Sequence, residues 1–255
     1  MSPRLDLNCD MGEGFGTWCM GQDEALLDHV TSANIACGFH AGDPATMART
    51  VKLALSKGVA IGAHPSLPDL QGFGRREMAI TPQEAQDLVL YQVGALAAFA
   101  RAAGGQLHHV KPHGALYNMA ARDRYLADAI AQAVLAFDRH LILVGLSGSQ
   151  LLLAGEALGL RCASEVFADR GYEADGSLTR RGTPGALIED ETTAIERVLR
   201  MAREGKVTCR TGETIRIQAD TVCLHGDQPQ ALAFAKRLRA ALAEAGIQTL
   251  PTHWP

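Results

Sequence analysis

Apolar segments typical of β-strands alternate with helical patterns along the whole chain. Each short segment rich in β-branched and other apolar residues precedes a longer stretch in which apolar residues recur every three to four positions. The strand segments are residues 4–10, 32–39, 59–64, 108–111, 141–146, 161–168 and 214–224, the last being one strand or a strand pair. This alternation predicts an α/β fold with a parallel sheet.

Capping residues indicate where the predicted helices begin. Asp43 precedes a helix over residues 44–56, and Thr81 with Glu84 three residues later forms a capping-box start to a long helix. Further helices are expected near residues 122–137, 150–158, 191–204 and 229–244. About seven strands separated by helices predict one irregular (β/α) barrel domain over residues 1–255.

Residues 169–189 differ from the rest of the chain. They contain Gly, Pro and several charges without helical or strand periodicity. A loop of this length inside a barrel is usually functional, so we expect this segment to contribute to a site.

Each predicted strand ends in a cluster of polar residues, such as NCDMGEGFG after the first and KPHGALYN after the fourth. In a parallel sheet all carboxyl ends lie on the same face, so distant residues converge there. The side chains expected in this common pocket are Asp10, Glu13, His40, Asp43, His64, Lys111, His113, Glu165, Asp169 and His225. Individually, Asp43 also fits a helix cap and His64 a turn residue before Pro65, but together these residues predict an active site.

Histidines and carboxylates favour hydrolysis or acyl chemistry, because both can transfer protons near neutral pH. Lys111 suits a substrate carboxylate or phosphate, or else an ion pair with a neighbouring acid. Asp10, His40 and His64 could meet around a metal, although no HExxH motif or cysteine pair supports one. Cys37 precedes His40 by three residues, but a small apolar residue of the second strand is the preferred interpretation over a nucleophile.

Charge and composition narrow the class of protein. The chain is 47% hydrophobic and carries 28 acidic and 24 basic residues, a formal net charge of −4, without blocks of one sign. This balance argues against nucleic acid or an anionic membrane as a partner. The first ten residues lack the pattern of a signal peptide, and the six scattered cysteines fit free thiols, so we expect a cytoplasmic protein.

Six separated motifs resemble the family of the 5-oxoprolinase A subunit, also called the LamB/YcsF family. They are DLNCDMGEGFG (6–16), SANIACGFHAGDP (32–44), GAHPSLPDLQGFGRR (62–76), VKPHGALYN (110–118), SEVFADRGY (164–172) and HGD (225–227). The resemblance implies a glycoside hydrolase/deacetylase-like barrel. It also implies ATP-dependent hydrolysis of 5-oxo-L-proline to L-glutamate by a complex with subunits B and C, with ATP as co-substrate. A homo-oligomer is a further partner that we consider.

The same resemblance implies a set of site residues, and we divide the candidates into two groups by role. We assign catalysis to Asp10, Glu13, His40, His64, Lys111 and His113. We assign substrate binding to Asn8, Asn34, Asp43, Glu165, Asp169, Arg170, His225 and Asp227. Lys111 is expected to neutralise substrate or phosphate charge, while His40 or His64 moves protons with Asp10 or Glu13. The alternatives are a metal-dependent, deacetylase-like hydrolase and a non-catalytic substrate-binding subunit.

Overall fold

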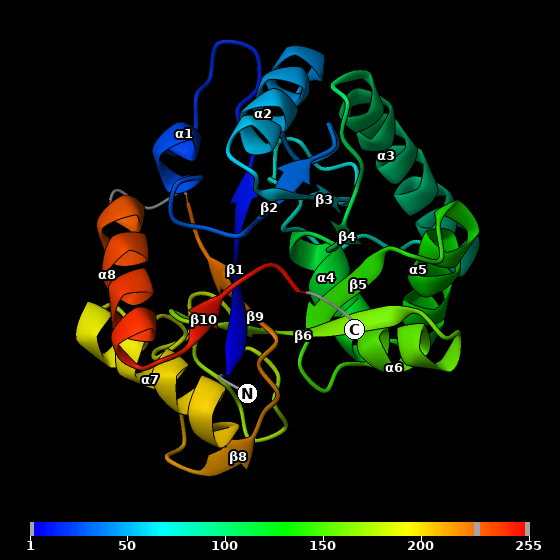
Figure 1. Ribbon diagram of the computed structural model, residues 1–255. Helices are drawn as coiled ribbons and strands as arrows, with labels where there is room; N and C mark the ends of the chain where they lie inside the picture. Colours follow the sequence, from blue (N-terminus) through cyan, green and yellow to red (C-terminus); the bar gives the residue numbers. More distant parts are fainter. Residues whose placement is uncertain (1–2, 227–229, 253–255) are drawn as a thin grey trace.

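The computed structural model describes residues 3–226 and 230–252 and shows a parallel β-barrel with helices around it (Figure 1). Seven parallel strands follow one another around the ring, and β9 closes it by pairing with β1. The barrel strands are β1 (Arg4–Met11), β2 (Ser32–Ala36), β3 (Ala60–His64), β4 (His109–Val110), β5 (Ile142–Leu146), β6 (Arg161–Phe167) and β9 (Thr221–Leu224). The predicted α/β barrel of about seven parallel strands is therefore confirmed, and it is closed.

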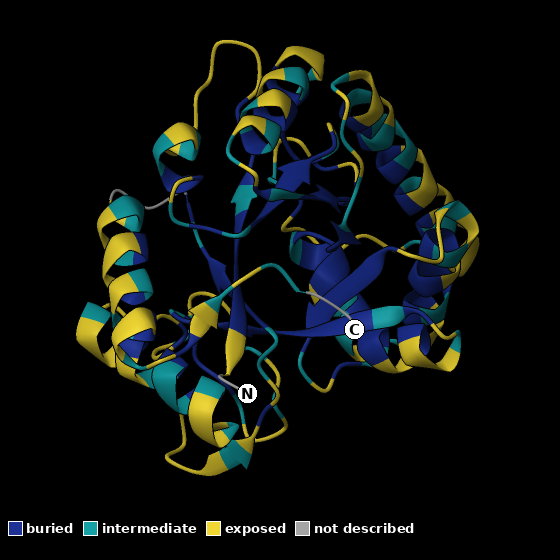
Figure 2. Ribbon diagram, viewed as in Figure 1, coloured by how far each residue is buried: buried dark blue, intermediate teal, exposed yellow. Residues whose placement is uncertain are grey.

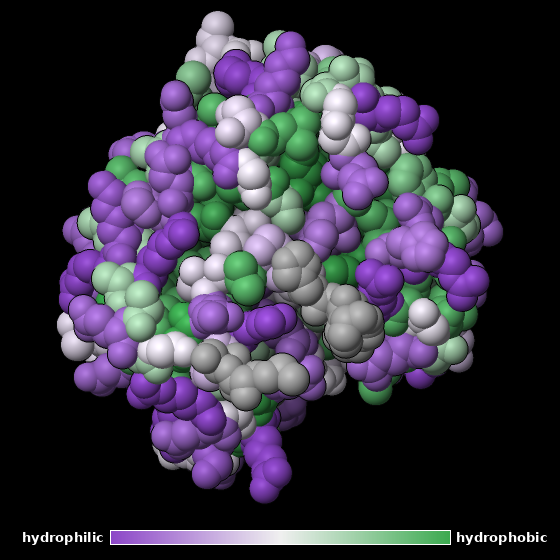
Figure 3. Space-filling view, viewed as in Figure 1, coloured by the Kyte–Doolittle hydropathy of each residue, from purple (hydrophilic) through white to green (hydrophobic). Residues whose placement is uncertain are grey.

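The helices lie outside the strands and expose only their outer faces (Figure 2). They are α1 (Asp23–Leu26), α2 (Pro44–Ser56), α3 (Pro82–Ala102), α4 (Gly114–Arg122), α5 (Arg124–Phe137), α6 (Gln150–Ala157), α7 (Glu191–Glu204) and α8 (Ala231–Glu244). Hydrophilic side chains cover much of the outer helices on the face shown in Figure 3. Among the described residues, no helix is both long and apolar enough to span a membrane.

The predicted caps begin two of these helices. The Asp43 carboxylate accepts hydrogen bonds from the amides of Ala45 and Thr46, and Thr81 forms the expected capping box with Glu84. Each cap accepts hydrogen bonds from amide groups that have no partner inside the helix. The starts of α2 and α3 can therefore be predicted from the sequence.

Short elements add detail to the sequence-based expectation. The motif that ends at Asn118 does not stay a loop, because helix α4 begins within it at Gly114. The run 214–224, expected as one strand or a strand pair, holds two strands: β8 (Thr214–Arg216), which pairs antiparallel with β7 (Lys206–Thr208), and the barrel strand β9. Strand β10 (Gln248–Thr249) adds to the start of β1. Strands of two or three residues are too short to show periodicity in the sequence. Their formation depends on hydrogen bonds to the neighbouring strand.

The barrel interior is polar at its centre. His109 of β4 lies beside Gly62 of β3 in the strand register, and its Nε2 atom is 2.7 Å from Asn34 Oδ1. A Cβ atom on Gly62 would lie 2.0 Å from that same nitrogen. Glycine at position 62 thus leaves the space that the buried imidazole occupies.

We expect Gly62→Ala to lower the free energy of unfolding by about 1–3 kcal/mol or more, because the added methyl group overpacks the interior. Chemical denaturation of the purified chain measures this change. Gly94→Ala is the matched control, since Gly94 lies in α3 and a Cβ there meets no atom within 4 Å. The control should be neutral or stabilising by up to about 1 kcal/mol. Equal stability of Gly62→Ala and the wild type would contradict the packing around His109.

Candidate active site

A cleft of about 1000 Å³ opens at the carboxyl ends of the barrel strands. Asp10 comes from the end of β1, His64 is the last residue of β3, Lys111 follows β4, and His225 follows β9. All four line this cleft, together with His113 at the start of α4. The parallel topology thus gathers residues that are more than 200 positions apart in the sequence, as predicted.

Lys111 is the centre of a buried network of charges. Its ammonium group lies 2.8 Å from Glu165 Oε1 and 3.0 Å from Asp10 Oδ1. It also donates to Asn8 Oδ1 at 3.1 Å and lies 3.2 Å from Cys223 Sγ. An ammonium has three protons, so these four neighbouring acceptor atoms occupy all of its hydrogen-bond donors. Of the two roles considered for Lys111, the structure shows the ion pair with neighbouring acids.

The network keeps both partners charged. Burial by itself would lower the pKa of the Lys111 ammonium, but the charges of Asp10, Cys223 and Glu165 raise it well above its usual range. Burial likewise opposes ionisation of Asp10, yet the charges of His64 and Lys111 hold its pKa well below the usual range. Asp10 is therefore an ionised carboxylate at the floor of the cleft.

Two asparagines hold these charged groups in place from below. Asn34 donates to Asp10 Oδ1 at 2.8 Å and to Asn8 Oδ1 at 2.7 Å. Asn8 in turn donates to Glu165 Oε1 at 3.0 Å and to Thr221 Oγ1 at 2.7 Å. These two asparagines and Glu165 are buried, and none of the three is among the described residues that line the cleft. Their role is therefore to position Asp10 and Lys111.

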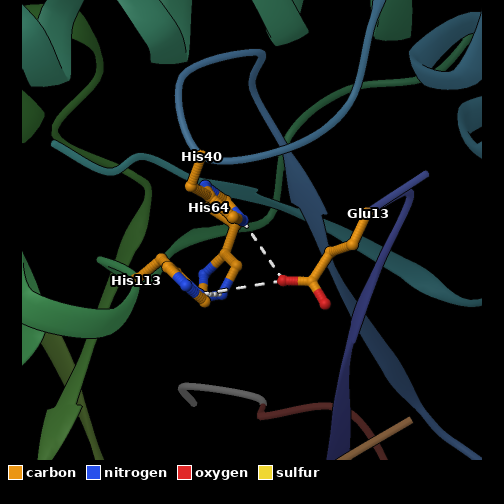
Figure 4. Close-up of side chains that lie close together, drawn as sticks. All are labelled: Glu13, His40, His64 and His113. Atoms are coloured by element: carbon orange, nitrogen blue, oxygen red, sulfur yellow. Dashed lines mark hydrogen bonds and ion pairs between the residues drawn. The ribbon is translucent and has the colours of Figure 1, made fainter. Parts of the chain in front are cut away.

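Three histidine rings gather beside Asp10, and the carboxylate of Glu13 points at them (Figure 4). His113 Nδ1 lies 2.9 Å from His64 Nε2, and His64 Nε2 is 3.3 Å from Asp10 Oδ2. His40 Nε2 lies 3.2 Å from Glu13 Oε1, and its ring stacks on that of His113 at 3.8 Å. Glu13, His40, His64 and His113 each offer one ligand atom within 4.8 Å of the others, so this group could hold a metal ion.

Burial favours neutral imidazoles at His40 and His113. It lowers the pKa of His40 well below the usual range, with the neighbouring His113 and His64 adding to the effect. Burial, followed by the charge of His64, lowers the pKa of His113 to about 3. Neutral rings can accept protons or bind a metal ion.

His225 and Asp169 form a second pair at the cleft. The Nδ1 atom of His225 lies 2.8 Å from Asp169 Oδ2, and its ring stacks on Phe167. Burial by itself raises the pKa of Asp169, but the charge and hydrogen bond of His225, together with a backbone hydrogen bond and the charge of Arg170, lower it overall. The carboxylate thus fixes the orientation of the ring, whose Nε2 atom lies 3.4 Å from a guanidinium nitrogen of Arg181.

Arginines surround the entrance of the cleft, and apart from Arg170 they were not among the residues predicted from the sequence. They are Arg75, Arg76, Arg122, Arg170, Arg180 and Arg181. Arg76 pairs with Asp69 and Arg122 with Glu77, while buried Arg170 donates to the carbonyl of Thr179 at 2.7 Å. Two signals pointed to this rim: the RR pair in the GFGRR motif and the charged loop 169–189. The excess of positive charge suits an anionic ligand.

Among the described residues of the predicted set, Asp43 lies apart from this centre. Asp43 caps α2 and also accepts the amide of Gly16 at 2.9 Å, and it does not line the cleft in the described part of the chain. Asp227 lies outside the described residues. Cys37, weighed as a nucleophile, is buried, and burial raises the pKa of its thiol to about 12. Cys37 follows the last residue of β2, and its burial fits the small apolar residue that was preferred over a nucleophile.

Comparison with known proteins shows the family. The model of the LamB/YcsF family matches residues 5–254. The chain belongs to this family. A LamB/YcsF relative from Methylococcus capsulatus, named as the A subunit of 5-oxoprolinase, is 64% identical over 97% of this chain and 95% of its own length. A relative of the same name from Bordetella pertussis is 63% identical over 97% of this chain and 98% of its own length.

Solved structures agree with the LamB/YcsF assignment. The lactam utilization protein from Thermus thermophilus superposes with a TM-score of 0.92, is 48% identical, and the match covers 97% of this chain and 99% of that protein. A family 4 carbohydrate esterase from Streptomyces lividans has a TM-score of 0.53 at 11% identity, over 97% of this chain and 91% of the esterase. The second likeness concerns the fold alone and agrees with the expected deacetylase-like barrel.

Proposed function

We propose that this chain is the lactam-opening component of an ATP-dependent 5-oxoprolinase. The observation that carries the proposal is the close identity, over nearly full length, to relatives named as the A subunit of 5-oxoprolinase. The name of the Thermus structure, a lactam utilization protein, supports the same class of substrate. The site agrees with this chemistry, because proton-transferring groups and cationic side chains line one cleft.

The chemistry explains a need for ATP. The five-membered lactam of 5-oxoproline is a resonance-stabilised amide, and phosphorylation of its carbonyl oxygen would create a better electrophile. ADP leaves in that step, water adds to the carbon, the carbon–nitrogen bond breaks, and the ring nitrogen takes a proton to become the amine. The resulting acyl phosphate is then hydrolysed by a second water to glutamate and inorganic phosphate. Ring opening therefore requires two proton transfers, one from water and one to nitrogen.

Asp10 is the group placed to move these protons. It lines the cleft and lies 3.3 Å from His64, whereas Glu13 and His40 are not among the described residues that line it. We assign proton transfer to Asp10, and to Lys111 the task of keeping Asp10 ionised through their 3.0 Å contact. Rim arginines, with Arg181 beside His225, take the substrate carboxylate or phosphate.

The proposal includes partners and location. The word "subunit" in the relatives' names supports a complex, which we propose to contain subunits B and C, with phosphorylation of the lactam assigned to the complex as a whole. We place this complex in the cytoplasm, where ATP is available.

The direct test is reconstitution of the chain with candidate subunits B and C, followed by measurement of glutamate formed from 5-oxo-L-proline. Glutamate should appear only when this chain, its partners and ATP are all present. Equal rates without this chain would reject its role in lactam opening. Activity of the isolated chain on the lactam without ATP would instead indicate a simple hydrolase.

Arg181→Gln should raise the KM for 5-oxoproline about tenfold or more in the reconstituted complex, because a charge-assisted contact with the substrate anion is lost. The turnover number should change less than KM. Arg139→Gln is the matched control, since Arg139 is exposed just before β5, at the opposite end of the barrel. The assignment fails if Arg181→Gln and Arg139→Gln have the same KM as the wild type.

A further inference from the structure

Backbone carbonyl groups determine which nitrogen carries the proton in two of the clustered histidines. His64 Nδ1 lies 2.7 Å from the carbonyl oxygen of Lys111, and His113 Nε2 lies 2.9 Å from that of Phe73. A carbonyl oxygen can only accept a hydrogen bond, so each of these nitrogens is the protonated one. When each ring carries only this proton, the opposite nitrogens, His64 Nε2 and His113 Nδ1, present lone pairs.

These two lone pairs face each other at 2.9 Å. Two acceptors at that distance repel unless a positively charged species lies beside them. Carboxylate oxygens lie close to each of these nitrogens: Glu13 Oε1 is 3.7 Å from His113 Nδ1, and Asp10 Oδ2 is 3.3 Å from His64 Nε2. A single proton bridges only two atoms, whereas the ligand atoms of Glu13, His64 and His113 all lie within 4.8 Å of one another, as the ligands of one metal ion do.

The ring planes show which histidines can share one ion. A metal bound to imidazole nitrogen lies near the plane of the ring, because the lone pair lies in that plane. The rings of His64 and His113 are nearly perpendicular at 82°, so one point can lie in both planes. The rings of His40 and His113 are parallel within 6° at 3.8 Å, so no point lies in both. His40 instead contacts Glu13 and holds its carboxylate.

We propose that Glu13 Oε1, His64 Nε2 and His113 Nδ1 bind one divalent transition-metal ion of the zinc type, with His40 as a positioning residue. Two imidazoles and one carboxylate suit zinc and its first-row neighbours better than magnesium or calcium. Three protein ligands leave a fourth position, and His64 and His113 line the cleft from which a water or substrate would enter. The carbonyls of Lys111 and Phe73 act as the outer acceptors that orient metal-binding histidines.

The arrangement needs a side-chain adjustment to hold zinc. Bonds of about 2.0–2.1 Å in a tetrahedral site separate ligand atoms by about 3.3–3.4 Å. The distances of 2.9 Å between the two imidazole nitrogens and 3.7 Å between His113 and Glu13 lie on either side of that value. The ligand atoms of Glu13 and His64 lie within 4.8 Å of each other, so a shift of the Glu13 carboxylate toward His64 completes the site.

Calorimetric titration of the chelator-treated, full-length chain with ZnCl₂ tests the site without reference to lactam turnover. We expect one ion per chain, and a cobalt(II) derivative with the visible absorption of a four- or five-coordinate ion. His64→Ala and His113→Ala should weaken binding at least 100-fold, Glu13→Gln should also weaken it, and His40→Ala should weaken it about tenfold. His140→Ala, which replaces an exposed histidine outside the cluster, is the matched control and should bind like the wild type.

Several results would overturn this proposal. The absence of zinc binding to the folded wild-type chain would leave a shared proton as the cation, which nitrogen chemical shifts of an imidazolium in His64 or His113 would reveal. Unchanged affinity in both His64→Ala and His113→Ala would reject the ligand set. A loss in His40→Ala as large as in His113→Ala would reject the role assigned to His40. Circular dichroism of each variant separates loss of the ligand from loss of the fold.

Discussion

Asp10→Asn will lower the turnover of the reconstituted 5-oxoprolinase on the order of 10³-fold, the range for loss of a group that transfers protons. Asp10 is the carboxylate that lines the cleft, lies 3.3 Å from His64 and stays ionised beside Lys111. Asparagine retains an oxygen that can accept from Lys111, but it can neither take a proton nor balance the charge. Steady-state measurement of glutamate formation gives the ratio of turnover numbers.

Asp43→Asn is the matched control for this prediction. Asp43 belongs to the same family-like motifs, but in the structure it caps α2. Asparagine caps helices as well as aspartate does, so turnover should stay within about twofold of the wild type. If Asp10→Asn also retained full turnover, the alternative of a non-catalytic substrate-binding subunit would be supported.

Lys111→Met will lower the free energy of unfolding by about 3–5 kcal/mol, the usual cost of removing one partner from a buried ion pair. Methionine fills a similar volume, so the main loss is the charge that compensates Asp10 and Glu165. Both carboxylates would then be buried without a counter-charge. Urea denaturation followed by circular dichroism measures the change.

A surface lysine provides the comparison. Lys57 pairs with Asp28 at 2.6 Å, but Asp28 is 58% exposed, so Lys57→Met should cost at most about 1 kcal/mol. Adding Glu165→Gln to Lys111→Met removes one stranded charge and should recover part of the lost stability. Equal losses in Lys111→Met and Lys57→Met would show that the buried network contributes no more than a surface pair.

The predicted elements were reliable where the local signal was strong. The cap residues Asp43 and Thr81 set the starts of α2 and α3, because capping depends on neighbours within three or four positions. Strand β2 ends at Ala36 rather than at residue 39, because the chain turns at Gly38 with φ +93°. Helix α4 was missed because its first residues belong to the polar cluster that ends β4.

The sequence predicted which residues meet at the candidate site, but it did not predict which of their atoms are in contact. Polar clusters after the strands were enough to place Asp10, His64, Lys111 and His225 at one cleft, since parallel strands share a carboxyl end. The arginine rim was not selected because Arg180 and Arg181 come from a loop without periodicity. Asp43 was included because one residue can suit both a pocket and a cap.

The sequence alone determined the alternation of strands and helices, the barrel class and the end at which chemistry gathers, because these follow from periodicity and strand direction. Only the tertiary structure decided that Lys111 is bonded to two acids, and that the planes of His64 and His113 cross while those of His40 and His113 do not. These contacts and ring orientations depend on side-chain torsion angles and on the packing of strands that are far apart in the sequence. No local pattern encodes the angle between two rings that meet only after the barrel has closed.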